Sequence, residues 1–289
     1  MFEPEIIELA KKYNYTFEDC QNELKKQYDG YNFSADGLSV YNPFSLLNSF
    51  ADKNFGSYWF STRTPTFLLK KMKEDNFEIQ KLTDKSLYAS ESALKDYTGD
   101  NLEQIPLLYQ SGYLTIADFD ITAREYTLSF PNEEVKYGFL EGLLPLYVEK
   151  SGPGYGLDIF TLRRHIEAGN LDKIRDVFTG LFANITYTIE TDPFEHYFQM
   201  VIYLVFTLLG KFAICEMHTY SGRVDCVLLA KKYIYLFEFK RDDTADSALK
   251  QIDDSGYALP FKSDDRRIYR IGVSFDSKTR MLKEWKVKE

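Results

Sequence analysis

The pattern of apolar and polar positions divides the 289-residue chain into a mainly helical first part and a mixed last part. Up to about residue 190, the sequence predicts helices separated by turns. Alternating apolar and polar residues at 113–116 and 126–130 predict one β-hairpin. The segment 74–105 gives no clear assignment. We therefore expect the first part to be helical with a small β-element.

Capping residues mark where the helices of the first part begin. An Asn or Thr before a proline, or a Thr with Asp three residues later, satisfies the free N–H groups of a first helical turn. Such residues predict helices after Thr16, Asn42 and Thr64. Asn132, which follows Pro131, is expected to cap a helix that continues to about Lys150, and further helices are expected at 158–167 and 170–182.

From residue 192 the pattern changes to short apolar strands between two helices. Asp192-Pro193 predicts the start of a strongly apolar helix that Gly210 ends. The elements expected after it are strands at 212–219, 223–229 and 233–240, a polar helix at 245–257 and a strand at 267–275. The order α-β-β-β-α-β predicts an α+β or mixed α/β domain with one sheet and helices against its faces.

Composition indicates an ordered protein with more than one core. Hydrophobic residues make up 44% of the chain and aromatic residues 16%, which is enough for two packed domains. The most apolar run, 200–209, has about half the length of a membrane span, and the N-terminus lacks the order of a signal peptide. We therefore expect a cytoplasmic protein without membrane contact, with its cysteines reduced.

Charge is distributed unevenly along the chain. The net charge of −9 argues against a protein that coats nucleic acid without specificity. Residues 219–289, however, contain 15 Lys and Arg against 12 Asp and Glu, so the net charge of this segment is +3. The basic share therefore lies in the segment with the candidate chemistry.

Two carboxylates interrupt apolar strands in this segment. Glu238 and Lys240 are two positions apart in the third strand, so their side chains should point to the same side. Asp225 lies in the apolar run before it, and a hairpin about residues 230–232 would bring both carboxylates to one end of the sheet. Buried acids need a compensating positive charge, and a single lysine cannot neutralise two. A divalent ion resolves this, because Mg²⁺ (or Mn²⁺) prefers oxygen ligands and is held by one or two carboxylates together with substrate phosphate oxygens.

Three further polar residues are candidates for the same site. Glu195 lies in the first turn of the apolar helix, although the positive end of a helix favours a carboxylate there in any case. Gln251 and Tyr257 follow Lys240 on the polar helix and could reach the same end of the sheet, or could be ordinary polar helix surface.

These residues resemble the PD-(D/E)XK nuclease superfamily. The matching features are Asp225, the Glu238-Phe239-Lys240 triplet after twelve intervening residues, a Glu-bearing helix before them and Gln251 on the helix after them. The resemblance implies a restriction-endonuclease-like αβββαβ domain. It also implies metal binding by Asp225 and Glu238, a catalytic role for Lys240, and supporting roles for Glu195, which is a further metal ligand, and Gln251.

Earlier segments resemble the bacterial family that joins an AAA-ATPase-like domain to such a nuclease-like domain. The segments are Tyr28-Asp29-Gly30-Tyr31, Val40-Tyr41-Asn42-Pro43, Tyr58-Trp59, Gln110-Ser111-Gly112-Tyr113-Leu114-Thr115 and Phe130-Pro131-Asn132-Glu133. The phosphate-binding Gly-x-x-x-x-Gly-Lys-Ser/Thr loop is absent, so we expect no ATP binding by this chain alone. The resemblance implies a helical remnant of the ATPase-like domain at 1–62, a mainly helical middle region with a β-hairpin at 63–190, and the nuclease-like domain at 191–289.

The sequence thus favours a Mg²⁺-dependent nuclease that hydrolyses nucleic-acid phosphodiester bonds, with DNA as the expected partner. A second interpretation stays open, because a nuclease fold can persist as a non-catalytic interaction module that acts with an ATPase or in defence against foreign DNA. The sequence does not decide between DNA and RNA, and it leaves homo-oligomer formation open.

Overall fold

The protein is described here by a computed structural model of two compact units, residues 1–143 and 144–289. The structure describes the chain apart from residues 1, 35–36, 60–65, 76, 78, 84, 96–103, 149–158, 184–193, 211–212, 220–221 and 280. It describes only the backbone, without the side chains, at 83, 95, 194–199, 215–219 and 222–223.

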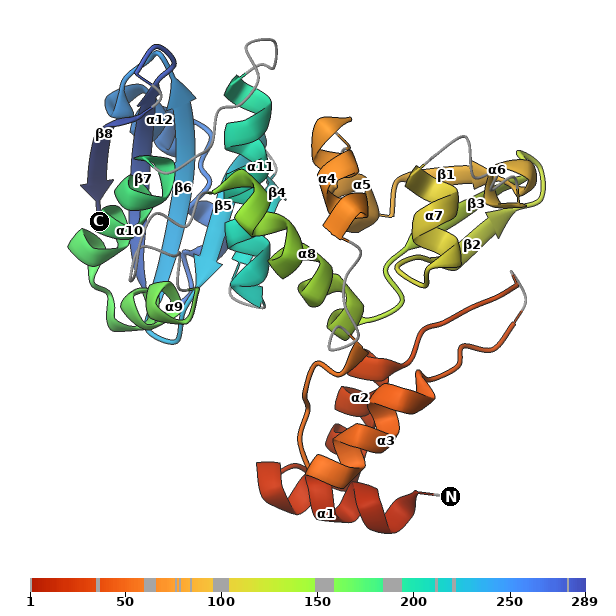
Figure 1. Ribbon diagram of the computed structural model, residues 1–289. Helices are drawn as coiled ribbons and strands as arrows, with labels where there is room; N and C mark the ends of the chain where they lie inside the picture. Colours follow the sequence, from red (N-terminus) through yellow and green to blue (C-terminus); the bar gives the residue numbers. More distant parts are fainter. Residues whose placement is uncertain are drawn as a thin grey trace. The chain divides into compact units, whose positions relative to one another are not determined.

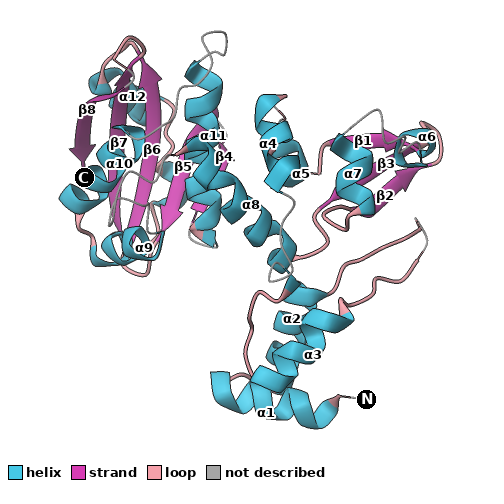
Figure 2. Ribbon diagram, viewed as in Figure 1, coloured by secondary structure: helices cyan, strands magenta, loops and turns pink. Residues whose placement is uncertain are grey.

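The first unit is mainly helical (Figures 1 and 2). Its helices are α1 (Glu3–Tyr13), α2 (Phe17–Tyr28), α3 (Pro43–Asp52), α4 (Thr66–Glu74), α5 (Gln80–Thr83), α6 (Glu91–Lys95), α7 (Gln104–Gln110) and the start of α8 (Glu133–Tyr147). The predicted caps Thr16 and Asn42 are confirmed, since each side chain accepts hydrogen bonds from N–H groups of the first turn. Asn132 caps α8 in the same way, whereas Thr64 and Lys150 lie outside the described residues.

A three-stranded antiparallel sheet accompanies these helices. The predicted hairpin is present as β2 (Thr115–Asp120) and β3 (Glu125–Ser129). The additional strand β1 (Leu87–Ser90) pairs with β3, so the order is β1-β3-β2. β1 falls in the segment that the sequence left unassigned.

Several segments of the first unit that carry the family resemblance pack against one another. Gly30 has φ +105°, and a Cβ atom there would lie 2.0 Å from the main-chain oxygen of Pro131, so only glycine fits. The carboxylate of Glu134 is buried and accepts hydrogen bonds from the N–H groups of Tyr58 (2.5 Å) and Trp59 (2.8 Å). These contacts give the segments a structural role.

The second unit is built around a five-stranded sheet of order β4-β5-β6-β7-β8 (Figure 2). Its elements are α9 (Ile159–Ala168), α10 (Leu171–Ala183), α11 (Phe194–Leu208), β4 (Ala213–Thr219), β5 (Gly222–Leu229), β6 (Tyr233–Arg241), α12 (Ala245–Asp254), the short 3-10 helix η3 (Leu259–Phe261), β7 (Arg267–Asp276) and β8 (Met281–Lys288). β6 and β7 are parallel, and the other neighbouring pairs are antiparallel. This is the predicted α-β-β-β-α-β order, followed by one strand that was not expected.

Helices cover both faces of the centre of this sheet (Figure 1). On one face, Ile234 and Leu236 pack with Ile252 of α12. On the other, Phe237 packs against Phe178 of α10 and Phe206 of α11. The strand β6 is therefore buried over most of its length, as its apolar sequence predicts.

Two boundaries in this unit differ from the sequence-based prediction. α12 ends at Asp254 and not at Tyr257, because the chain turns at Gly256, which has φ +59°. The sheet continues beyond β7 into β8, whose residues are mostly exposed or half-buried. Residues 192–193, the predicted start of α11, lie outside the described part of the chain. Among the described helices, none combines the length and apolar composition of a membrane span.

Candidate functional site

The β5–β6 hairpin brings the two strand carboxylates together. The turn begins at Ala230, whose N–H donates to the main-chain oxygen of Tyr233 at 2.9 Å. The strand register pairs Cys226 with Phe237, so the next position outward places Asp225 opposite Glu238. Directly opposite residues of an antiparallel pair share a face of the sheet, so both acids lie on the same side.

Asp225 is fixed against the neighbouring strand. Its Oδ2 accepts a hydrogen bond of 2.8 Å from the N–H of Phe239, one residue after Glu238. This contact holds the carboxylate beside β6 at the point where the β5–β6 pairing of the apolar core ends. The predicted convergence of the two acids is therefore present.

Glu238 is an acidic residue that is buried, although an ionised carboxylate is more stable in water. Its side chain is 2% exposed, and its Oε2 has no hydrogen-bond partner among the described residues. Burial and, to a smaller extent, the nearby charge of Asp225 raise the pKa of Glu238 from its ordinary value of 4.5 to about 7, against the opposing effect of Lys240. The positive charge of Lys240 alone therefore does not fully stabilise the ionised form of Glu238 near neutral pH.

Lys240 links Glu238 to α12. Its Nζ donates to Glu238 Oε1 at 3.1 Å and also to Gln251 Oε1. The amide nitrogen of Gln251 in turn donates to the hydroxyl of Tyr257 at 3.4 Å. Gln251 of α12 therefore reaches the site and accepts a hydrogen bond from the lysine, and Tyr257, which follows the end of α12, contacts Gln251.

The donor set fits a divalent cation with oxygen ligands. Two carboxylates lie together at one sheet end, and Mg²⁺ is commonly held by one or two carboxylates with waters and phosphate oxygens. The unpartnered Oε2 of Glu238 is an available ligand atom. Among the described residues, no group of three His, Cys, Asp or Glu side chains is placed to hold a metal. Glu195, the third predicted ligand, belongs to the backbone-only stretch of α11, so its side chain lies outside the described part.

Sequence reasoning missed two contacts that shape the site. The main-chain N–H of Phe239 donates a hydrogen bond to Asp225. Every residue except proline has such an N–H group, so the sequence cannot indicate this contact. Ser274 is fully buried beside Lys240 in the β6–β7 register and donates to the main-chain oxygen of Asp243 at 2.5 Å. A serine in an apolar strand is the one sequence signal that could have drawn attention to this position.

Comparison with known proteins agrees with the geometry of this unit. An uncharacterized protein in the vnfD 5' region of Azotobacter chroococcum mcd 1 is 32% identical over 277 residues, which cover 91% of this chain. The chain spans about half of that relative, 51% of its length. No solved structure matches the chain significantly. Residues 193–285 match the family model of the PD-(D/E)XK nuclease superfamily, and this part of the chain is therefore a domain of that superfamily.

Proposed function

We propose that this domain is a Mg²⁺-dependent nuclease that hydrolyses phosphodiester bonds of DNA. The observation that carries the proposal is Glu238, a carboxyl group at 2% exposure whose pKa is raised to about 7 by burial and by the charge of Asp225. One lysine lies beside these two acids. A divalent cation, Mg²⁺ or Mn²⁺, would supply the missing positive charge.

Asp225 and Glu238 are the proposed metal ligands, and Glu195 is a further ligand proposed on the resemblance alone. A bound divalent ion lowers the pKa of a coordinated water and neutralises charge on the reacting phosphate. The hydrogen bond from the N–H of Phe239 holds the Asp225 carboxylate beside β6.

Lys240 has the geometry of a group that acts on the attacking water or on the phosphate. An ammonium group has three N–H donors, and two of them are used by Glu238 and Gln251. The third donor can orient a water or stabilise negative charge on the phosphate oxygens in the transition state. Gln251 is a positioning residue, because it holds the ammonium group through its own side chain and is itself held by Tyr257.

Plasmid cleavage tests the proposal. Wild-type protein with Mg²⁺ or Mn²⁺ should convert supercoiled DNA to open forms, and EDTA should stop the reaction. Asp225→Asn, Glu238→Gln and Lys240→Met should each lower the rate at least about a hundredfold. Asp254→Asn, which removes an exposed acid from α12, is the matched control and should cleave as wild type does.

A parallel assay separates the proposal from the non-catalytic alternative. Calorimetric titration with Mn²⁺ should show binding to wild type that Glu238→Gln loses. If neither metal binding nor cleavage of any nucleic acid is found, the domain is an interaction module and the proposal fails. Cleavage of RNA but not DNA would keep the hydrolytic chemistry and reject the proposed substrate. The ATPase-like origin of residues 1–62 and the absence of ATP binding by this chain stay predictions. Nucleotide titration tests the absence of ATP binding.

A further inference from the structure

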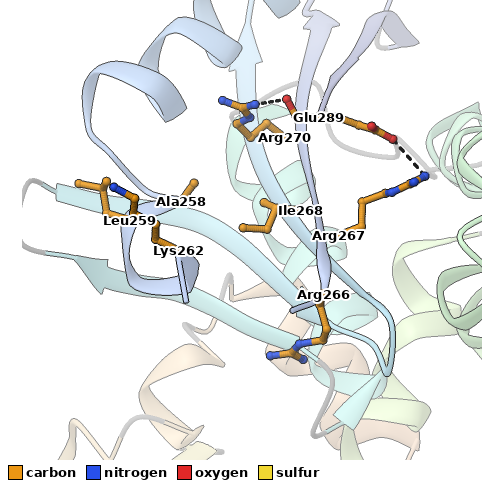
Figure 3. A pocket seen from close by; sticks show the side chains of 8 residues that line it. All are labelled: Ala258, Leu259, Lys262, Arg266, Arg267, Ile268, Arg270 and Glu289. Atoms are coloured by element: carbon orange, nitrogen blue, oxygen red, sulfur yellow. Dashed lines mark hydrogen bonds and ion pairs between the residues drawn. The ribbon is translucent and has the colours of Figure 1, made fainter. Parts of the chain in front are cut away.

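A pocket of about 470 Å³ lies apart from the candidate site, where η3 meets the start of β7. Its volume lies in the range of small-molecule sites. Lys262, Arg266, Arg267 and Arg270 contribute positive charge to its lining, and Glu289 is its single acid (Figure 3). No residue of this lining belongs to the Asp225–Glu238–Lys240 site.

The basic residues of the pocket differ in how far their charges are already compensated. Arg266 pairs with Asp264 at 2.6 Å, and Arg270 pairs with Asp253 at 2.9 Å. Neither of these acids lines the pocket, so they fix the guanidinium groups without filling the space. The ammonium group of Lys262 is exposed and has no hydrogen bond or ion pair with any residue that the structure describes.

Glu289 shows that oxygen acceptors fit against this surface. Its Oε1 lies 3.3 Å from Nη1 of Arg267, and its main-chain oxygen accepts a hydrogen bond from Arg270 (Figure 3). Both side chains of the Arg267–Glu289 pair are about 60% exposed, at 60% and 61%, so water competes with this contact. An incoming anion can therefore replace the Glu289 carboxylate at little cost.

We propose that this pocket binds a phosphate group of the nucleic-acid strand that the domain acts on. The reasons are its unpaired lysine, its three guanidinium groups and the exposed apolar surface of Leu259 beside Ile268, on which a sugar or base can rest. The assignment of the strand as ligand rests on the proposed nuclease function, whereas the phosphate chemistry rests on the pocket alone.

The pocket and the candidate site lie at opposite ends of the parallel pair β6–β7. Ile268 of the pocket pairs with Ile234, and Glu238 lies four positions further along the same strand. At about 3.3 Å per residue the separation along the strand is about 13 Å, which is about four nucleotides of a stacked strand. The pocket would therefore hold the strand about four nucleotides from the phosphate that reacts.

Binding measured in EDTA tests this inference without cleavage. The probe is a fluorescent single-stranded DNA 12-mer without terminal phosphates, followed by anisotropy over a range of salt concentrations. Lys262→Ala should weaken binding by about fivefold and lower the salt slope by about 0.7, as expected for one lost phosphate contact. Glu289→Gln removes the competing carboxylate and should tighten binding by about twofold. Lys250→Ala, the same charge change on the exposed surface of α12, is the control and should leave the salt slope unchanged.

The two variants are expected to change affinity in opposite directions, which a general loss of fold cannot produce. Equal affinity and salt slope for wild type, Lys262→Ala and Glu289→Gln would overturn the inference. Inorganic phosphate is the second probe. If it binds in a Lys262-dependent manner while the 12-mer does not, the pocket takes free phosphate and the strand assignment is wrong. Plasmid cleavage that is normal in Lys262→Ala, together with unchanged binding, rejects the pocket but leaves the proposed nuclease intact.

Discussion

Glu238→Gln should make the metal-free protein more stable at pH 8 while it abolishes cleavage. The glutamine keeps the shape of the side chain but carries no charge, so it removes the cost of ionising a buried group. The wild-type carboxyl group has its pKa raised to about 7, chiefly by burial and then by the charge of Asp225. An unfolded chain would ionise it near the ordinary value of 4.5.

The sign and size of the effect follow from this difference. Below pH 4.5 the group is protonated in both states and the raised pKa costs nothing. Between pH 4.5 and about 7 the group is ionised in the unfolded state but still protonated in the folded state, so the free energy of unfolding falls as the pH rises over this range. A pKa raised from 4.5 to about 7 corresponds to about 3 kcal/mol, which is the full loss above pH 7. The glutamine variant should lack this loss.

Urea unfolding in EDTA at pH 5 and pH 8 measures the difference. The chain has two tryptophans, and Trp285 packs against Phe237 in the second unit, so a Trp59→Phe background gives a fluorescence signal from that unit. Wild type should lose about 2.5 kcal/mol between the two pH values relative to Glu238→Gln, because a small part of the loss has already occurred at pH 5. Asp254→Asn is the control for removal of an exposed acid and should follow wild type.

Added Mg²⁺ distinguishes a metal site from a buried carboxylate that binds no ion. Binding to the folded state should restore stability to wild type at pH 8 and should leave Glu238→Gln unchanged. If wild type is as stable at pH 8 as at pH 5 relative to the variant, or if the glutamine destabilises the protein at pH 8, the reasoning about the buried charge is refuted.

Three further changes test the packing and the positioning around the site. Gly272→Ala places a Cβ atom 2.2 Å from the main-chain oxygen of Ala245, so urea unfolding should show a loss of about 2–3 kcal/mol. Tyr235→Phe removes a buried 2.6 Å hydrogen bond to a main-chain oxygen of α9 and should cost about 1 kcal/mol in the same assay. Gln251→Ala removes an acceptor from Lys240 and should lower the cleavage rate about tenfold with unchanged Mn²⁺ affinity by calorimetry; equal loss of both would contradict a positioning role.

The core of the second unit could be predicted because its signals are strong and local. The strand Tyr233–Arg241 has apolar residues at both odd and even positions, which is typical of a strand covered on both faces. Glu238 and Lys240 stand out against that background, and their common side follows from the two-residue period of a strand. The hairpin partner Asp225 follows once the turn at residues 230–232 is recognised.

The missed elements have weak or non-local signals. β8 contains Met281-Leu282-Lys283-Glu284 and further charged residues, so its sequence resembles that of a polar surface segment. It forms a strand because it pairs with β7. The four-residue strand β1 becomes a strand only because β3 offers it a partner. The basic pocket combines side chains of residues 258–270 with Glu289, and the sequence alone does not show that these side chains line one space.

The position of the acids in the sheet explains why a cation, and not a simple ion pair, is the better account of them. Glu238 and Lys240 lie at the carboxyl end of β6, where the parallel strand β7 runs beside it and the chain leaves the sheet towards α12. Ligands of mixed sheets with parallel strands commonly bind beyond such ends. If Lys240 alone balanced Glu238, the pair would need no second acid, and yet Asp225 is held in place by a main-chain N–H and raises the pKa of its neighbour. Repulsion between two ionised carboxylates lowers the stability of the folded domain, and a further positive charge would relieve it, which is the condition that the proposed metal-dependent phosphodiesterase would meet in its working state.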